Sequence, residues 1–332
     1  MRIGLIGVGR IGAFHAETLV GLPMVTSVVL TDADPGRARA VADPLGAEHR
    51  PDVTTLLDAS LDGVVIAAPT AAHAPLIGAA ARAGLPTFCE KPVAGSSAET
   101  RAVLADVAAA GVELHIGFQR RFDAGFRAAR EAVASGRLGW LHTMRACTCD
   151  PQPPHPDYLP SSGGIFRDCS VHDYDMVRWV SGQEVVTVYA TGANRGDEFF
   201  AAADDVDTGV TVLTLADGTL ATCSAARYNG AGYDVRLEVA GSAGTVVAGL
   251  TGQAALTSAE GAGWPPGVPY GGFLDRFRDA YVAELTAFTE VVAGQRVSPC
   301  TGADALAALL IADAAERSRR SGRPVTIEEV AA

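Results

Sequence analysis

Lysine occurs only once in the chain, at Lys91, among 26 basic residues. An ammonium group is a compact charge that can release a proton, which a guanidinium cannot do. Lys91 stands in Glu90-Lys91-Pro92, directly after a short apolar run that is typical of a strand. Since ligands of open parallel sheets bind at the carboxyl ends of the strands, this position favours a role in chemistry. The alternative interpretation is that lysine has been replaced by arginine throughout the chain and that Lys91 is a remaining lysine without a special role.

A second group of ionisable residues lies in Asp168-Cys169-Ser170-Val171-His172-Asp173-Tyr174-Asp175. Offsets of four and three residues place Asp168, His172 and Asp175 on one face of a helix. Histidine exchanges a proton near neutral pH, and a carboxylate one turn away can orient its ring. The segment therefore predicts an acid/base group beside the Pro-rich loop 150–160. Acids that cap a helix, with His172 packed beside them, explain the same pattern.

A glycine-rich segment, Gly7-Val8-Gly9-Arg10-Ile11-Gly12, follows the first apolar run and opens a helical pattern. In a dinucleotide site of this type, the glycines permit a tight turn, close approach of the pyrophosphate, and close helix packing. The helix N-terminus then offers N–H groups to phosphate. Asp32 ends the next strand pattern, where an acid binds ribose hydroxyls. The segment predicts an NAD site, and the alternative is a glycine-rich turn of a flavodoxin-like domain.

Strand and helix patterns alternate over residues 1–119. The predicted strands are Ile3–Ile6, Val25–Thr31, Gly63–Ala67, Thr87–Cys89 and Glu113–Gly117. The predicted helices are Ile11–Val20, Pro35–Ala42, Ala74–Ala83 and Ala98–Ala110. This alternation predicts a Rossmann domain, in which a doubly wound parallel sheet is covered on both faces.

Residues 120–332 have a different pattern, with helices at both ends and alternating strands between them. The predicted helices are Ala124–Ser135, Ser170–Val180, Phe273–Val292 and Asp304–Arg319. The predicted strands are Glu184–Ala190, Thr208–Leu215, Thr219–Tyr228, Tyr233–Ala240 and Thr245–Ala248. Asp217-Gly218 and Gly241–Gly244 supply hairpin turns. We therefore predict an α/β protein whose C-terminal α+β domain, 120–332, contains a largely antiparallel sheet.

Composition excludes several classes of protein. The 332 residues fit two domains, and the strand pattern at the N-terminus together with the lack of an eighteen-residue apolar run predicts a cytoplasmic protein. A net charge of −12 disfavours nucleic-acid and membrane partners. The six cysteines include no Cys-x-x-Cys pair and match no common zinc spacing, so we expect reduced thiols and no metal. Arg120-Arg121 is most simply interpreted as a pair of solvated charges.

The sequence resembles, nearly end to end, the glucose-fructose oxidoreductase/inositol dehydrogenase/rhizopine catabolism (Gfo/Idh/MocA) family of nicotinamide-dependent oxidoreductases. The segments that carry the resemblance are Gly7–Gly12, Ala68-Pro69-Thr70-x-x-His73, Glu90-Lys91-Pro92 and Gly163–Asp168 running into His172-Asp173-x-Asp175. Resemblance to the inositol 2-dehydrogenases within the family rests on Gly117–Asp123, Asp150-Pro151-x-Pro153-Pro154, Gly232–Asp234 and Arg276-Phe277-x-x-Ala280-Tyr281.

The resemblance implies roles for particular residues. Lys91, Asp168 and His172 correspond to the catalytic lysine–aspartate–histidine set. The residues expected to contact substrate are Arg120, Asp150, Asp175 and Tyr233. Those expected to bind the cofactor are Gly7, Gly9, Arg10, Ile11, Gly12, Asp32, Pro69, Thr70, His73, Glu90, Lys91 and Tyr281. The family also implies a homodimer or homotetramer formed through the antiparallel sheet.

The implied reaction transfers a hydride from a secondary hydroxyl of a cyclic polyol to NAD. Myo-inositol, giving the 2-keto inosose, is the leading substrate. Some inositol dehydrogenases have a histidine where this chain has Thr148 and a tyrosine where it has Ala231, so another inositol isomer or a sugar is the alternative substrate. Two other functions stay open: a non-catalytic sugar or nucleotide sensor, and an NAD-dependent glycosidase.

Overall fold

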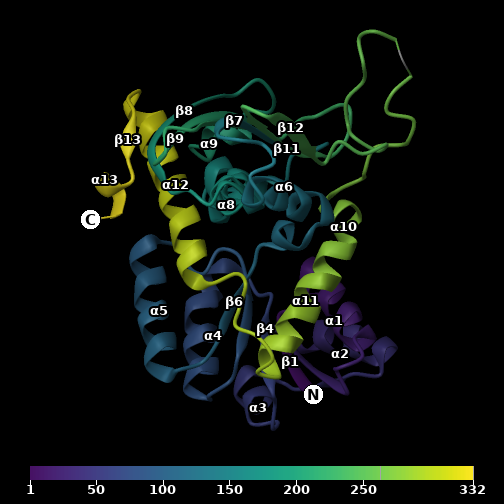
Figure 1. Cartoon of the computed structure of the whole chain (residues 1–332). Coiled ribbons are helices and arrows are strands. Elements are labelled where there is room, and N and C mark those ends of the chain that lie inside the picture. The colour runs from purple at the N-terminus through teal and green to yellow at the C-terminus, as the bar shows by residue number, and fades with distance from the viewer. Residues whose placement is uncertain (262, 332) are drawn as a thin grey trace. The chain divides into compact units, whose positions relative to one another are not determined.

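The computed structural model describes residues 1–261 and 263–331, which form two compact units (Figure 1). Unit 1 comprises Met1–Gln119 and Tyr281–Leu306. Unit 2 comprises Arg120–Ala280 and the chain from Ala307 on. The predicted boundary at residue 119/120 did not include this return of the chain to unit 1, which begins at Tyr281.

Six parallel strands form the sheet of unit 1, in the order β3-β2-β1-β4-β5-β6. They are β1 (Arg2–Ile6), β2 (Ser27–Thr31), β3 (Glu48–His49), β4 (Gly63–Ile66), β5 (Thr87–Glu90) and β6 (Leu114–Gly117). The order reverses between β1 and β4, which is the switch point where doubly wound sheets bind dinucleotides. The predicted Rossmann fold is confirmed.

Five helices connect these strands: α1 (Arg10–Gly21), α2 (Pro35–Leu45), α3 (Val53–Leu57), α4 (Thr70–Arg82) and α5 (Ser97–Ala110). Within unit 1, α1 packs against α2, and α4 packs against α5 (Figure 1). Local capping fixes where helices begin: the Asp34 carboxylate accepts from the Gly36 and Arg37 N–H groups. The sequence did not predict β3 and α3, because elements this short have no measurable periodicity.

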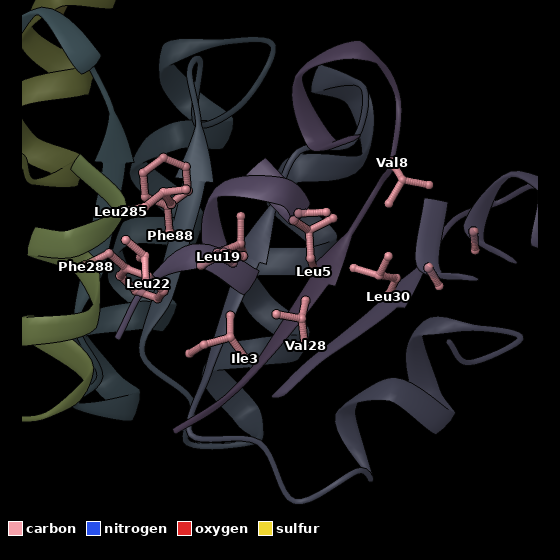
Figure 2. Packing of buried hydrophobic residues seen from close by; sticks show 14 residues of the cluster. Ile3, Leu5, Val8, Leu19, Leu22, Val28, Leu30, Phe88, Leu285 and Phe288 are labelled. Atoms are coloured by element: carbon pink, nitrogen blue, oxygen red, sulfur yellow. The ribbon is translucent and has the colours of Figure 1, made fainter. Parts of the chain in front are cut away.

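The hydrophobic core of unit 1 explains the return of the chain. Helix α11 (Arg278–Val292) carries Leu285 and Phe288, which are fully buried. Figure 2 shows both residues beside Leu22 and Phe88, and the Phe88 and Phe288 ring centroids are 5.8 Å apart. Burying side chains of this size stabilises a fold by about 1.5–3 kcal/mol each, so α11 is an integral part of unit 1.

Unit 2 contains a seven-stranded sheet in the order β12-β11-β7-β10-β9-β8-β13. Its strands are β7 (Leu141–Cys149), β8 (Val185–Ala193), β9 (Thr208–Leu215), β10 (Leu220–Ala226), β11 (Asp234–Gly241), β12 (Gly244–Ala248) and β13 (Val325–Thr326). Every pair is antiparallel except β7 with β10. The largely antiparallel sheet is confirmed, but the sequence did not predict β7, because its buried side chains are only Met144, Ala146 and Thr148.

The helical elements of unit 2 begin with the 3-10 helix η1 (Gln119–Phe122), which starts at the unit boundary, and continue with α6 (Ala124–Ala134), η2 (Pro156–Tyr158), α7 (Leu159–Ser162), the π-helical turn η3 (Phe166–Ser170), α8 (Val171–Ser181), α9 (Phe199–Ala202), α10 (Phe273–Arg276), α12 (Gly302–Ser321), which begins in unit 1, and α13 (Glu328–Ala331). Helices α6 and α8 pack against each other and against the sheet (Figure 1). The single helix predicted over Phe273–Val292 is wrong, because non-helical backbone at Phe277 separates α10 from α11.

Candidate active site

The glycine-rich turn lies between β1 and α1 in unit 1. Gly7 has a φ of +90°, and a Cβ at Gly12 would lie 2.0 Å from the Gly7 carbonyl oxygen, so both positions require glycine. Gly9 is different: a Cβ there would meet nothing within 4 Å. No side chain caps α1, whose first turn contains Arg10, Ile11 and Gly12. The open space beside Gly9 and the uncapped helix end fit a pyrophosphate.

Asp32 lies directly after β2 and supports this turn. Its carboxylate accepts a 2.8 Å hydrogen bond from the Val8 N–H and a 2.9 Å bond from the Asp34 N–H. Arg37 Nη1 donates to the same carboxylate at 3.2 Å, while 54% of the Arg37 side chain stays exposed. The acid predicted to bind ribose is therefore fixed beside the turn, with a partly exposed cation next to it.

Two loops at the carboxyl ends of β4 and β5 are joined by one buried side chain. Pro69 and Thr70 begin α4, and Lys91 and Pro92 follow β5. His73 Nε2 lies 2.7 Å from the Ala68 carbonyl oxygen, and Nδ1 lies 2.6 Å from the Pro92 carbonyl oxygen. The structure thus brings Lys91 to the strand-end edge that the sequence predicted.

Glu90 and Tyr281, both predicted to bind the cofactor, meet a buried cluster in unit 1. Glu90 Oε1 lies 2.7 Å from His15 Nε2, and the His15 ring packs against Tyr281 with centroids 5.7 Å apart. Glu284, on α11, is fully buried, and neither of its carboxyl oxygens has a hydrogen-bond partner among the described residues. Burial, together with the charge of Glu90, raises the pKa of Glu284 well above its usual range. Burial therefore favours the protonated, neutral form of Glu284.

In unit 2, a buried arginine bridges two of the predicted site carboxylates. Arg227, directly after β10, donates from Nη2 to Asp168 Oδ2 at 2.7 Å and from Nη1 to Asp150 Oδ2 at 3.1 Å. Burial opposes the charge of Arg227, but the neighbouring Cys169, Asp168 and Asp150 outweigh it and raise its pKa. Burial raises the pKa of Asp150, against the effect of Arg227. The bridge holds the two carboxylates close together.

Asp168 lies in the π-helical turn η3, directly before α8. Its second oxygen, Oδ1, accepts a 2.9 Å hydrogen bond from the Tyr158 hydroxyl. Burial and the Asp168 charge raise the pKa of Tyr158, so this hydroxyl remains a donor at neutral pH. His172 follows in the first turn of α8 and is partly exposed. Since π-helical turns are frequent at functional sites, this change of helix type supports the predicted site.

The interpretation of Arg120-Arg121 as solvated charges is wrong, because each side chain is buried against a carboxylate. Arg120 Nη1 donates to Asp173 Oδ1 at 2.6 Å. Arg121 donates from Nε and Nη2 to the two oxygens of Asp175, at 2.9 and 2.5 Å. Asp175 is fully buried in this bidentate pair. The structure therefore gives Arg120 and Asp175 structural partners, whereas the sequence predicted substrate contacts.

Thr148, the position where some relatives have histidine, belongs to the same buried network. Its hydroxyl lies 2.9 Å from Arg120 Nη2 and 2.9 Å from each oxygen of Asp173. Ala231, the second departure, is exposed in the loop before β11. The two departures therefore lie in different environments: Ala231 is exposed, whereas Thr148 bridges the buried ion pair of Arg120 and Asp173.

Tyr233 lies next to both polar networks of unit 2. Its backbone N–H donates to the Tyr270 carbonyl at 3.2 Å, and the side chain is 6% exposed. Burial raises its pKa; Arg120 opposes that shift, and Asp150 adds to it. Tyr233 thus keeps a neutral hydroxyl that can donate or accept a hydrogen bond.

Sequence reasoning missed four residues of these networks: Tyr158, Asp173, Arg227 and Arg121, the last of which it treated as solvent-exposed. Asp173 and Arg121 lie within segments that the prediction did single out. Arg227 carried no signal, because its spacing does not distinguish one arginine at a strand end from the 24 other arginines of the chain. Tyr158 lies in the Pro-rich loop, where no periodicity guides a prediction.

These groups can bind a neutral, hydroxyl-rich molecule and exchange a proton with it. Arg120, Arg121 and Arg227 are all paired with carboxylates, so these three side chains leave little positive charge for a phosphate group. In the described part of the chain, no three acidic, histidine or cysteine side chains cluster in a way that could hold a metal ion. No described helix has the length and apolarity of a membrane span.

Comparison with known proteins places both parts of the chain in one family. Residues 1–118 match the oxidoreductase family with an NAD-binding Rossmann fold, and residues 126–247 match the GFO/IDH/MocA C-terminal domain. The inositol 2-dehydrogenase of Rhizobium meliloti is 39% identical, over 98% of this chain and 99% of that protein. The myo-inositol 2-dehydrogenase of Thermotoga maritima is 37% identical, over 99% of both.

Among solved structures, the scyllo-inositol dehydrogenase of Lactobacillus casei, which contains NAD(H) and scyllo-inositol, matches with a TM-score of 0.88 at 27% identity and covers 99% of both chains. Both family matches, the identity over the whole chain and the geometry of the glycine-rich turn agree. The chain belongs to the Gfo/Idh/MocA family of oxidoreductases and carries an NAD-binding Rossmann domain.

Proposed function

We propose that this protein is an NAD-dependent dehydrogenase that oxidises one secondary hydroxyl of myo-inositol to the 2-ketone. The observation that carries the proposal is the Asp150–Arg227–Asp168 bridge, in which one guanidinium holds two partly exposed carboxylates, 25% and 13% exposed. Such a pair accepts hydrogen bonds from the hydroxyls of a neutral ring. The two inositol dehydrogenases that match over nearly the whole chain support the same substrate class.

We assign the proton transfer to His172, which accepts the proton of the reacting hydroxyl. Asp168, which is fixed by hydrogen bonds from Tyr158 and Arg227, orients His172 and helps it to accept the proton. Lys91 stabilises the negative charge that develops on the substrate oxygen. When bound, NAD supplies a hydride acceptor at nicotinamide C4. The balance is one hydride to NAD and one proton to His172 for each C–OH oxidised to C=O.

Residues of unit 1 would hold the cofactor. Gly7, Gly9 and Gly12 shape the turn, and the N–H groups of the first turn of α1 would donate hydrogen bonds to the pyrophosphate. Asp32 would accept hydrogen bonds from the adenosine ribose. The predicted contacts of Pro69, Thr70, Glu90 and Tyr281 with the cofactor remain part of the proposal.

For the substrate, Asp150 and Tyr233 would bind ring hydroxyls that do not react. A site built to hydrogen-bond a hydroxyl rejects analogues that lack it, so the enzyme should discriminate sharply among isomers. Arg120 and Asp175, which the sequence predicted as substrate contacts, would position the site through Asp173 and Arg121. Another inositol isomer or a pyranose is the second candidate substrate, because Ala231 is exposed and small.

We also propose that the protein forms a homo-oligomer through the outer face of the unit 2 sheet. Alternating residues of β8, β9 and β10 leave large apolar side chains exposed on that face: Val186, Tyr189, Val210, Val212 and Leu220. An apolar sheet face of this kind is typical of a protein interface. Light scattering of the wild type and of a Val212→Lys variant tests whether this face forms the oligomer.

The proposed location is the cytoplasm, because the six free thiols fit a reducing compartment.

The function is tested by following NADH absorbance while the purified protein is offered myo-inositol, other inositol isomers, glucose, galactose, a sugar acid and a sugar phosphate. Myo-inositol should react fastest. Lys91→Ala and His172→Ala should each lose about 10²–10⁴-fold in turnover. If either variant kept turnover within about threefold of the parent, the substituted residue would have no essential role in the mechanism. Activity confined to a sugar phosphate, or release of an aglycone without net NADH, would contradict the proposed function.

A further inference from the structure

The two ring nitrogens of His73 both contact oxygens that can only accept hydrogen bonds. Nδ1 lies 2.6 Å from the Pro92 carbonyl oxygen, and Nε2 lies 2.7 Å from the Ala68 carbonyl oxygen. His73 is 1% exposed, so solvent contributes little to either contact. Both carbonyls belong to loops at the carboxyl ends of neighbouring strands, since Ala68 follows β4 and Pro92 follows β5.

A neutral imidazole cannot satisfy both contacts. It has one N–H donor and one nitrogen with a lone pair, and a carbonyl oxygen offers no proton to that lone pair. Two lone pairs facing each other at less than 2.8 Å repel. Both contacts, 2.6 and 2.7 Å, are short enough for hydrogen bonds, and each is satisfied only if the ring nitrogen carries the proton.

We propose that His73 is a buried, doubly protonated imidazolium, and that it acts as a positioning residue which fixes the backbone on which Lys91 stands. The second half of this statement rests on the proposed catalytic role of Lys91. The imidazolium donates one hydrogen bond to each loop and so ties the Lys91–Pro92 segment to the loop that begins α4. It differs from the sequence-based prediction, in which His73 lines the cofactor.

The energetics of the site favour this arrangement. Burial of a charge is costly, and hydrogen bonds reduce that cost; both donors of this imidazolium have a carbonyl oxygen as acceptor. Lys91 is the residue next to Pro92, so a shift of the Pro92 carbonyl moves the Lys91 backbone directly. Because a displacement of about 1 Å of a catalytic group can reduce turnover about 10²-fold, a clamp at this place affects catalysis without touching substrate.

The charge state is tested on the wild-type protein by neutron diffraction from a deuterated crystal grown at neutral pH. The proposal predicts deuterium on both Nδ1 and Nε2 of His73. Deuterium on a single ring nitrogen would overturn it. This measurement needs neither a variant nor a known substrate, so it stays decisive even if the proposed dehydrogenase function fails.

The positioning role is tested by His73→Gln, with His142→Gln at an exposed strand position as the matched control. Gln keeps N–H donors on one nitrogen only and cannot reach both carbonyls. We expect kcat with the best polyol to fall about tenfold or more, while the Kd for NAD, measured by fluorescence quenching, stays within about threefold. Unchanged kcat with weakened NAD binding would overturn the positioning role and support a cofactor contact. Should the Gln variant not fold, His73→Asn is the second test.

Discussion

Arg227 joins Asp168 and Asp150 by donating a hydrogen bond to each from a separate nitrogen. The bond to Asp168 is 2.7 Å long, and the bond to Asp150 is 3.1 Å long. The side chain is 3% exposed, so the guanidinium is surrounded by protein. A planar fork can hold two carboxylates at fixed separation, whereas an ammonium cannot reproduce that geometry. The bridge therefore sets the distance between two groups of the proposed polyol site.

We predict that Arg227→Lys lowers kcat/KM for the polyol by about tenfold or more, because one ammonium cannot hold both Asp150 and Asp168. Arg296→Lys is the matched control, since Arg296 is 43% exposed and pairs with Glu290 at the surface. Steady-state kinetics of both variants provide the comparison. Equal kcat/KM for the two variants would show that the bridge does not matter for the reaction.

Asp175→Asn should mainly reduce stability. Removal of one partner leaves Arg121 buried without its carboxylate, which typically costs about 3–5 kcal/mol. Glu238→Gln, in the exposed pair with Arg145, should change the free energy of unfolding by less than about 1 kcal/mol. Urea denaturation measures both. If Asp175→Asn instead raised KM for the polyol and left stability unchanged, Asp175 would be a substrate contact, as the sequence predicted.

The pH dependence of stability should reveal Glu284. Its pKa is raised in the folded protein, so the unfolded chain releases this proton first, above its ordinary pKa of about 4.3. The contribution of Glu284 is therefore complete below that pH and is lost as pH rises toward the folded pKa, at up to about 1.4 kcal/mol per pH unit. Glu284→Gln has no proton to lose. We predict that wild-type Tm falls more than variant Tm between pH 5 and 8. Parallel Tm changes would contradict a buried neutral acid.

The cofactor preference should follow Asp32. Its carboxylate would repel the 2′-phosphate of NADP, so the ratio of kcat/KM should favour NAD. Arg37 lies 3.2 Å from Asp32 and is available to hold that phosphate only when the acid is removed. Asp32→Ala should therefore narrow the ratio, and Arg37→Ala should leave NAD preferred. A wild-type ratio in favour of NADP would refute the assignment.

The N-terminal fold was predictable from sequence because its signals are local. The glycines at 7, 9 and 12 and the apolar strands each act within a few residues, and the structure places them as expected. Strand β7 was missed because its buried positions carry small or polar side chains, and only its neighbours β10 and β11 define it. Pairing with residues 77 or more positions away leaves no mark on a short window of sequence.

The candidate site was predictable in part, for a related reason. Residue type and spacing singled out Lys91, Asp168 and His172, and the structure places them at a strand end and at a helix start. The partners of these residues depend on distant contacts: Arg227 lies 59 residues from Asp168, and Arg121 lies 54 residues from Asp175. No local rule distinguishes a solvated arginine from a buried one, so Arg120-Arg121 was misread.

The most direct test of the proposed reaction uses myo-inositol that carries deuterium at C2. The protein should transfer this deuterium to NAD, and mass spectrometry should detect NADH one mass unit heavier, together with the 2-keto product. Since the labelled C–H bond breaks during hydride transfer, kcat/KM should also be lower than with unlabelled substrate. Unlabelled NADH would place the oxidation at another carbon. If no NADH forms, myo-inositol is not the substrate.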